Sequence, residues 1–202
     1  MNLLQDITIG AFVSRLVAMV LYSGVLGFLL AILARLLGDP RPKFDGRLTL
    51  NPFAHMAPSG VLLATLFGMG WIRPMRYDGS KNRWGKPGVL LVLLGGLLLS
   101  LLTLPLVDIL RRVLVNLLPL SIANIVIYVL MHYQQIAVGT AALNLLPLPG
   151  LVCGAIWPVL RPDREKRIMR KEPVMLAVVA AAIVAGFISN PASWLLPYFS
   201  SL

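Results

Sequence analysis

Residues 88–107 read GVLLVLLGGLLLSLLTLPLV, an apolar stretch without a charged side chain. As an α-helix, such a stretch matches the roughly 30 Å hydrocarbon core of a lipid bilayer. The 202-residue chain is 58% hydrophobic and 13% charged, whereas soluble proteins are about 45–50% apolar and about 25% charged. We therefore expect one all-α, polytopic membrane domain over residues 1–202. The other apolar stretches are residues 7–37, 58–72, 117–146 and 173–188.

The Lys and Arg residues predict how the chain crosses the membrane. Residues 35–47 hold four of them, residues 73–86 five, residues 108–118 two and residues 161–171 six. If the short stretch 58–72 spans the membrane, the two sides carry six and eleven. If it enters and returns on the same side, they carry fifteen and two. The sharper division follows the positive-inside rule, and it predicts four transmembrane helices plus one short re-entrant, half-membrane segment.

This topology predicts that the basic segments, including a basic loop at residues 161–171, face the cytoplasm from the inner membrane of a cell. The N-terminus, an Arg111-Arg112 loop and an interfacial tail at residues 192–202 face outward, and residues 173–188 form the last transmembrane helix. The net charge is +10. Because the basic residues lie between apolar runs, contact with the lipid bilayer explains them better than nucleic-acid binding.

Two segments between the apolar stretches carry an unusual motif. Residues 38–60 read GDPRPKFDGRLTLNPFAHMAPSG, and residues 144–149 read NLLPLP. In order and spacing they resemble segments of the site-2 protease family of intramembrane zinc metalloproteases, with a protease-like core over about residues 15–160. The resemblance implies structural roles for a set of motif residues: Gly38, Asp39, Pro40, Gly46, Arg47, Asn51, Pro52, His55, Asn144 and Pro147.

The catalytic residues of that family are missing from this chain. The family carries His-Glu-x-x-His twelve residues ahead of the Gly-Asp-Pro, so that two histidines on one helix face hold zinc and the glutamate acts as base. The corresponding residues here are Leu26, Gly27 and Leu30, and Val152 replaces the aspartate that is the third ligand. Leucine and valine offer no lone pair to a metal. The resemblance therefore implies a degenerate, proteolytically inactive member without a cofactor.

Polar residues within the stretch 117–146 are a second group of candidates, because polar groups inside a membrane are costly unless they are paired. In the simplest interpretation they hydrogen-bond neighbouring helices or a partner subunit. Alternatively, His132 with Gln134 or Gln135 contacts a quinone-like or pigment-like ligand, or His132 is an axial metal ligand. The candidate contact residues, including two glycines that allow close helix packing, are His132, Gln134, Gln135, Asn124, Gly95 and Gly96.

Three functions are compatible with these features. The first is an inactive protease relative that binds other integral membrane subunits, as an accessory, scaffold or assembly subunit of a larger complex. The second is an active intramembrane metalloprotease with unrecognised ligands, although the chain has only two histidines and one cysteine. The third is a small membrane transporter, against which stands the lack of acidic residues within the apolar stretches.

Overall fold

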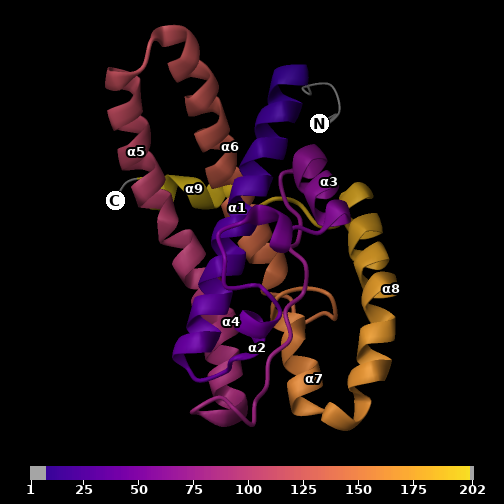
Figure 1. The fold of residues 1–202 in the computed structure, drawn as a ribbon. Helices are drawn as coiled ribbons and strands as arrows, with labels where there is room; N and C mark the ends of the chain where they lie inside the picture. The colour runs from indigo at the N-terminus through magenta and orange to yellow at the C-terminus, as the bar shows by residue number, and fades with distance from the viewer. Residues whose placement is uncertain (1–7, 201–202) are drawn as a thin grey trace.

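A computed structural model describes the fold of residues 8–200 (Figure 1). Helices dominate this part of the chain, and its strand-like pairing is an isolated antiparallel bridge between Met56 and Ile72. The all-α prediction is thus confirmed for the described residues. The elements are α1 (Ile9–Leu36), α2 (Arg41–Phe44), η1 (Pro52–Ala54), α3 (Pro58–Phe67), α4 (Gly85–Leu101), α5 (Thr103–Leu117), α6 (Leu120–Asn144), η2 (Cys153–Ala155), α7 (Ile156–Leu160), η3 (Pro162–Arg164), α8 (Glu165–Val184) and α9 (Ala192–Ser200).

Helix α1 is the centre of the molecule and packs against α3, α4 and α6. It begins at Thr8, whose Oγ1 accepts a hydrogen bond from the Ala11 amide at 3.2 Å and so caps the first turn. Alanine, serine and glycine occupy much of its buried face. These small residues let neighbouring helix backbones approach closely, as is common between membrane helices.

Within residues 8–200, three helical segments are long and apolar enough to cross a membrane: Ile9–Leu36, Gly85–Leu117, in which α4 and α5 follow each other, and Ile122–Asn144. They fit a membrane protein. Helix α3 has ten residues, about half of what a full crossing needs. It ends at Gly68, which adopts the left-handed conformation (φ +74°) typical of helix C-termini.

The prediction of a loop at Arg111-Arg112 is wrong, because α5 continues through both residues. Asp108 and Arg111 lie one turn apart and form an ion pair at 3.0 Å, an arrangement that supports a helix. The turn into α6 comes later, at Leu118 and Pro119. Proline disfavours the helical conformation in the residue before it, which explains why the helix stops there.

The basic stretch 161–171 also differs from the expected loop. Its first residues form η3, and from Glu165 onward it is the charged first part of α8. Lys, Arg and Glu are good helix formers, and the helix runs on through Pro173 to Val184. The predicted last transmembrane helix is therefore the second half of a longer, two-part helix.

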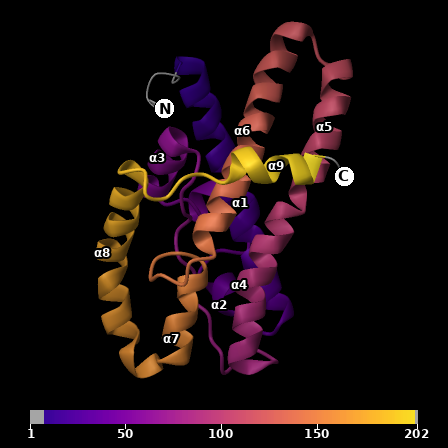
Figure 2. The ribbon, with the colours of Figure 1, turned by 180° about the vertical axis from the view of Figure 1, so that it is seen from behind.

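The first helix of the described chain runs along the molecule, whereas the last one lies across it. Helix α1 runs from one end of the molecule towards the other, and α5 and α6 form a hairpin beside its first half (Figure 1). Helix α9, within the predicted interfacial tail, lies across α5 and α6 (Figure 2). Residues 1–7 and 201–202, which belong to the predicted outward-facing termini, lie outside the described part.

Candidate functional site

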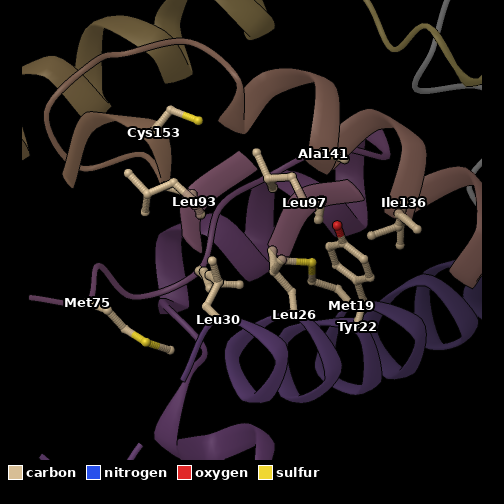
Figure 3. Packing of buried hydrophobic residues seen from close by; sticks show 14 of the residues in the cluster. Met19, Tyr22, Leu26, Leu30, Met75, Leu93, Leu97, Ile136, Ala141 and Cys153 are labelled. Carbon is tan, nitrogen blue, oxygen red and sulfur yellow. The ribbon is translucent and has the colours of Figure 1, made fainter. Parts of the chain in front are cut away.

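The positions that the resemblance aligns with two histidine ligands lie in the main apolar cluster. Leu26 and Leu30 are almost fully buried on α1, at 0% and 1% exposure. Figure 3 shows them pointing from α1 towards Leu93 and Leu97 of α4. A Cβ atom added at Gly96 would lie 2.4 Å from Leu30 Cδ2, so the leucine occupies the notch that this glycine leaves open.

The position between them, Gly27, is covered by the imidazole of His55. A Cβ atom at Gly27 would lie 2.1 Å from His55 Nδ1 and 2.7 Å from its Cβ. His55 is fully buried, and its Nε2 lies 2.8 Å from the Thr49 carbonyl oxygen. A carbonyl only accepts, so Nε2 carries the proton and Nδ1 is the bare nitrogen. Burial lowers the pKa of His55. The hydrogen bond to Thr49 acts in the opposite sense, and the positive charge of Arg47 adds a smaller lowering.

The fourth position, Val152, is held in place by Asn144 at the end of α6. Asn144 Oδ1 accepts a hydrogen bond from the Val152 amide at 3.1 Å. Its Nδ2 donates to the carbonyls of Gly70 at 3.0 Å and Thr140 at 2.7 Å. Val152 is 6% exposed and belongs to the same apolar cluster as Leu26. One amide side chain thus joins three segments behind the cluster.

The Gly-Asp-Pro turn docks the loop after α1 onto residues 77–83. Asp39 is 1% exposed, and its carboxylate accepts hydrogen bonds from the amides of Arg41 (3.0 Å) and Asp78 (2.6 Å). The Arg41 guanidinium donates to the Tyr77 carbonyl at 3.1 Å and pairs with Asp78 at 3.3 Å. Gly38 begins this turn at φ +98°, a conformation that L side chains rarely adopt.

The remaining motif residues complete the same loop. Asn51 caps η1 by accepting from the Phe53 amide at 3.1 Å, while Pro52 starts that turn. The Arg47 guanidinium donates to the Ala54 carbonyl. The other motif residues form ordinary turn positions or partly exposed contacts: Pro40, Gly46 (φ +69°) and Pro147, whose carbonyl accepts from Trp157 Nε1 at 2.6 Å.

The polar candidates on α6 do not gather at one point. His132 Nδ1 lies 3.1 Å from Gln135 Oε1, and the ring of Tyr128 packs edge-on against the imidazole at 4.9 Å. Gln134 is buried and donates to the Leu104 carbonyl at 3.4 Å. Asn124, like Gln135, is exposed. His132 Nε2 is buried and has no hydrogen-bond partner within residues 8–200.

The two glycines of α4 have different surroundings. Leu30 fills the space beside Gly96, whereas a Cβ atom added at Gly95 would lie 3.5 Å from Leu33 Cδ1, an ordinary contact distance. A groove of about 230 Å³ between α4 and α6 is lined instead by apolar side chains of these helices and α9. Its lining residues are Leu94, Leu97, Leu98, Leu101, Val138, Ala141, Ala142, Leu145 and Leu195.

Sequence reasoning missed a second hollow, a cavity of about 430 Å³ that charged residues line. Three arginines and three acidic residues face it from separate segments: Arg47, Arg73, Arg76, Asp45, Glu165 and Glu172. The arginines were visible in the sequence, where they predicted the topology. Only the spacing of Glu165, Met169 and Glu172, which places them on one helix face, could have indicated a shared wall.

Metal-binding side chains do not cluster in the part of the chain that the structure describes: no three His, Cys, Asp or Glu residues there are grouped so that they could hold an ion. Cys153, beside Val152, is buried and free. Leu26, Gly27, Leu30 and Val152 are called the apolar seam below. The side chains of this seam make apolar packing contacts.

Comparisons with known proteins point to the metalloproteases over a limited stretch. A protein of Bacillus subtilis (strain 168) named "Putative zinc metalloprotease YwhC" is 47% identical to this chain over 45 residues. The match covers 22% of this chain and 20% of that protein, so the similarity spans about a fifth of the relative's length. No family model and no solved structure matches the sequence.

Proposed function

We propose that the chain is a proteolytically inactive relative of the site-2 proteases. It acts by binding other integral membrane subunits, as an accessory, scaffold or assembly subunit of a larger complex. The observation that carries this proposal is the apolar seam. Leucine fills both histidine positions, and the imidazole of His55 lies where a side chain at residue 27 would begin.

The hydrogen bonds around the seam support a binding role. Asn144 and Asp39, both buried, still tie the loops to the helices. A scaffold can therefore persist while the seam itself is closed by apolar packing. The groove between α4 and α6 offers a partner helix a concave surface that includes Ala141 and Ala142, and small residues of this kind let helix backbones pack closely in membranes.

We further propose four crossings and an inner-membrane location, with the basic segments in the cytoplasm. Helix α8 would be the fourth crossing and α3 the short half-membrane segment. The arrangement supports this orientation, because α2, the start of α4 and the start of α8 lie towards the same end of the molecule (Figure 1). The α5–α6 turn lies at the opposite end (Figure 1).

Purification of the full chain from its native membrane in a mild detergent tests the proposed function. We expect a stoichiometric membrane-protein partner to co-purify and zinc to stay below about 0.1 per chain, because a tightly held zinc ion needs three or four ligands. The control is the same preparation after mild heating, which should release the partner.

Two results would contradict this proposal. One is recovery of a folded monomer without any partner. The other is about one zinc per chain, together with cleavage of a transmembrane peptide, which would favour the alternative of an active metalloprotease with other ligands.

A further inference from the structure

The charged cavity of about 430 Å³ is separate from the apolar seam, since none of the seam residues lines it. Its walls come from the loop at residues 45–47, the extended segment 73–77, residues 150–158 and the first turns of α8. Its size lies within the range of about 300–1,000 Å³ that is usual for small-molecule sites. The cavity therefore has room for a polar ligand.

One wall of the cavity is cationic. Arg47, Arg73 and Arg76 line it, and Arg47 is 8% exposed. Burial lowers the pKa of Arg47, the neighbouring positive charge of Arg73 lowers it further, and the charge of Asp45 acts in the opposite sense. Two guanidinium groups that repel each other in this way would be stabilised by an anion between them.

Tyr77 adds an unused hydrogen-bond donor beside these arginines. Its side chain lines the cavity and is 5% exposed. Its hydroxyl is buried and has no hydrogen-bond partner among the described residues. Burial raises the pKa of Tyr77, so the hydroxyl keeps its proton and can donate. A buried donor without a partner costs free energy, which a ligand oxygen would recover.

The other charged lining is acidic. Glu165 and Glu172 face the cavity from α8, and Asp45 faces it from the loop after α2. Burial raises the pKa of Glu172, with the charge of Arg76 acting in the opposite sense. The ion pairs within residues 8–200 join other groups. Opposite charges thus line one cavity without pairing with each other.

Equal numbers of cationic and acidic side chains fit a zwitterion better than a simple anion. Arginine forks match phosphate oxygens, and carboxylates pair with a primary ammonium group. A quaternary ammonium group prefers a cage of aromatic rings, and Tyr77 is the aromatic residue among those that line the cavity. The chemistry therefore favours an ammonium group that can donate hydrogen bonds.

The depth of the cavity fits the head-group layer of a membrane. Glu172 lies immediately before Pro173, where the apolar half of α8 begins. Trp84, before α4, and Trp157, in α7, are exposed, as is common for tryptophan at the membrane interface. We propose that this cavity binds a phosphoethanolamine group, with phosphate at Arg47, Arg73 and the Tyr77 hydroxyl and ammonium at Glu165 and Glu172. This inference rests on the proposed crossing of α8 and does not depend on the proposed loss of proteolytic activity.

Calorimetric titration of the purified full chain in a nonionic detergent tests the inference. The probes are short-chain phosphatidylethanolamine, phosphatidylglycerol and phosphatidylcholine, together with free phosphoethanolamine and inorganic phosphate. We expect phosphatidylethanolamine to bind at least about tenfold more tightly than the other two lipids. Tighter binding of this lipid than of free phosphoethanolamine assigns the site to a lipid head group, and the reverse assigns it to the free compound. Equal affinity for the three lipids, or inorganic phosphate binding as tightly as phosphoethanolamine, would overturn the proposal.

Single substitutions connect the binding to the cavity. We expect Arg73→Gln and Tyr77→Phe to weaken phosphatidylethanolamine binding by about tenfold each. Glu172→Gln should remove the preference over phosphatidylglycerol. Arg83→Gln changes an exposed arginine that does not line the cavity and should have no effect. Unchanged melting temperatures without lipid show that the variants are folded, and wild-type affinity in folded Arg73→Gln and Glu172→Gln would refute the assignment.

Discussion

At the scale of the residue, Gly27 and His55 form the tightest contact of the seam. The imidazole lies against the glycine backbone, and its Nε2 and its own carbonyl are both hydrogen-bonded, to Thr49 and to the Arg73 amide. The imidazole cannot swing away without breaking its bond to Thr49, and the bond from the Arg73 amide holds the backbone of His55 in place. The absence of a side chain at residue 27 is therefore part of the packing.

Gly27→Ala should destabilise the protein by about 2 kcal/mol or more, because the added methyl group overlaps His55. The measurement is the free energy of unfolding in mixed detergent micelles. The matched control is Gly95→Ala, where the nearest atom, Leu33 Cδ1, would lie at 3.5 Å. Equal stability of the two variants would show that His55 can relocate freely.

The stability contribution of His55 should depend on pH. Its pKa is lowered from the ordinary value of 6.5 in the folded protein, so the unfolded chain binds a proton more readily. Stability should therefore fall as the pH drops below about 6.5 and should level off below the folded pKa.

His55→Gln provides the reference for this measurement, since its amide can still donate to the Thr49 carbonyl. The melting temperatures of wild type and variant should diverge with pH, the wild type losing stability relative to the variant on acidification. Parallel curves between pH 8 and pH 5 would contradict the expectation.

At the scale of the element, the end of α6 is fastened by Asn144, whereas its beginning is exposed. The Asn144 side chain hydrogen-bonds the backbone carbonyl of Gly70 and the backbone amide of Val152, which belong to two segments far apart in the sequence. The packing of α1 against α6 thus continues into the loops through one amide group. This position determines where Val152 lies relative to Leu26.

Asn144→Ala should lower the free energy of unfolding by about 2–4 kcal/mol, because it removes three hydrogen bonds and leaves buried groups unpaired. Detergent unfolding followed by tryptophan fluorescence measures the loss. Asn124→Ala, an exposed asparagine on the same helix, should change the stability by less than about 0.5 kcal/mol. Similar losses in both variants would show that the loss does not come from the three hydrogen bonds of Asn144, since alanine is the better helix former at either position.

At the scale of the whole molecule, α8 decides the topology. Its charged first turns and apolar second half share one helix, and the apolar half packs Val179 and Ile183 onto a second cluster that includes Trp71 and Leu143. The cluster connects α8 to the rest of the fold. If the apolar half crosses the membrane, residues after it lie outside, on the same side as the α5–α6 turn.

Single cysteines in a Cys153→Ser background test this topology. An impermeant maleimide added to intact cells should label Asn116→Cys and Ser189→Cys and should not label Ser80→Cys, all three of which are exposed positions. Labelling of Ser80→Cys after permeabilisation is the positive control. If Ser189→Cys also requires permeabilisation, α8 does not cross.

The sequence by itself determined the helical class and the apolar stretches, because hydrophobic length and charge are local properties. It also predicted structural roles for the motif residues, among which Asp39 and Asn144 are buried and hydrogen-bonded. It misjudged the ends of helices, at Arg111 and at Glu165, where helix-forming charged residues resemble loops.

Only the tertiary structure decided which side chains meet. The contact of His55 with Gly27, the insertion of Leu30 at Gly96 and the charged cavity beside α8 all join segments that are distant in the chain. Such contacts depend on the packing of one helix face against another. Three of the arginines that predicted the cytoplasmic side in the sequence therefore line, in the folded chain, one cavity together with three acidic residues.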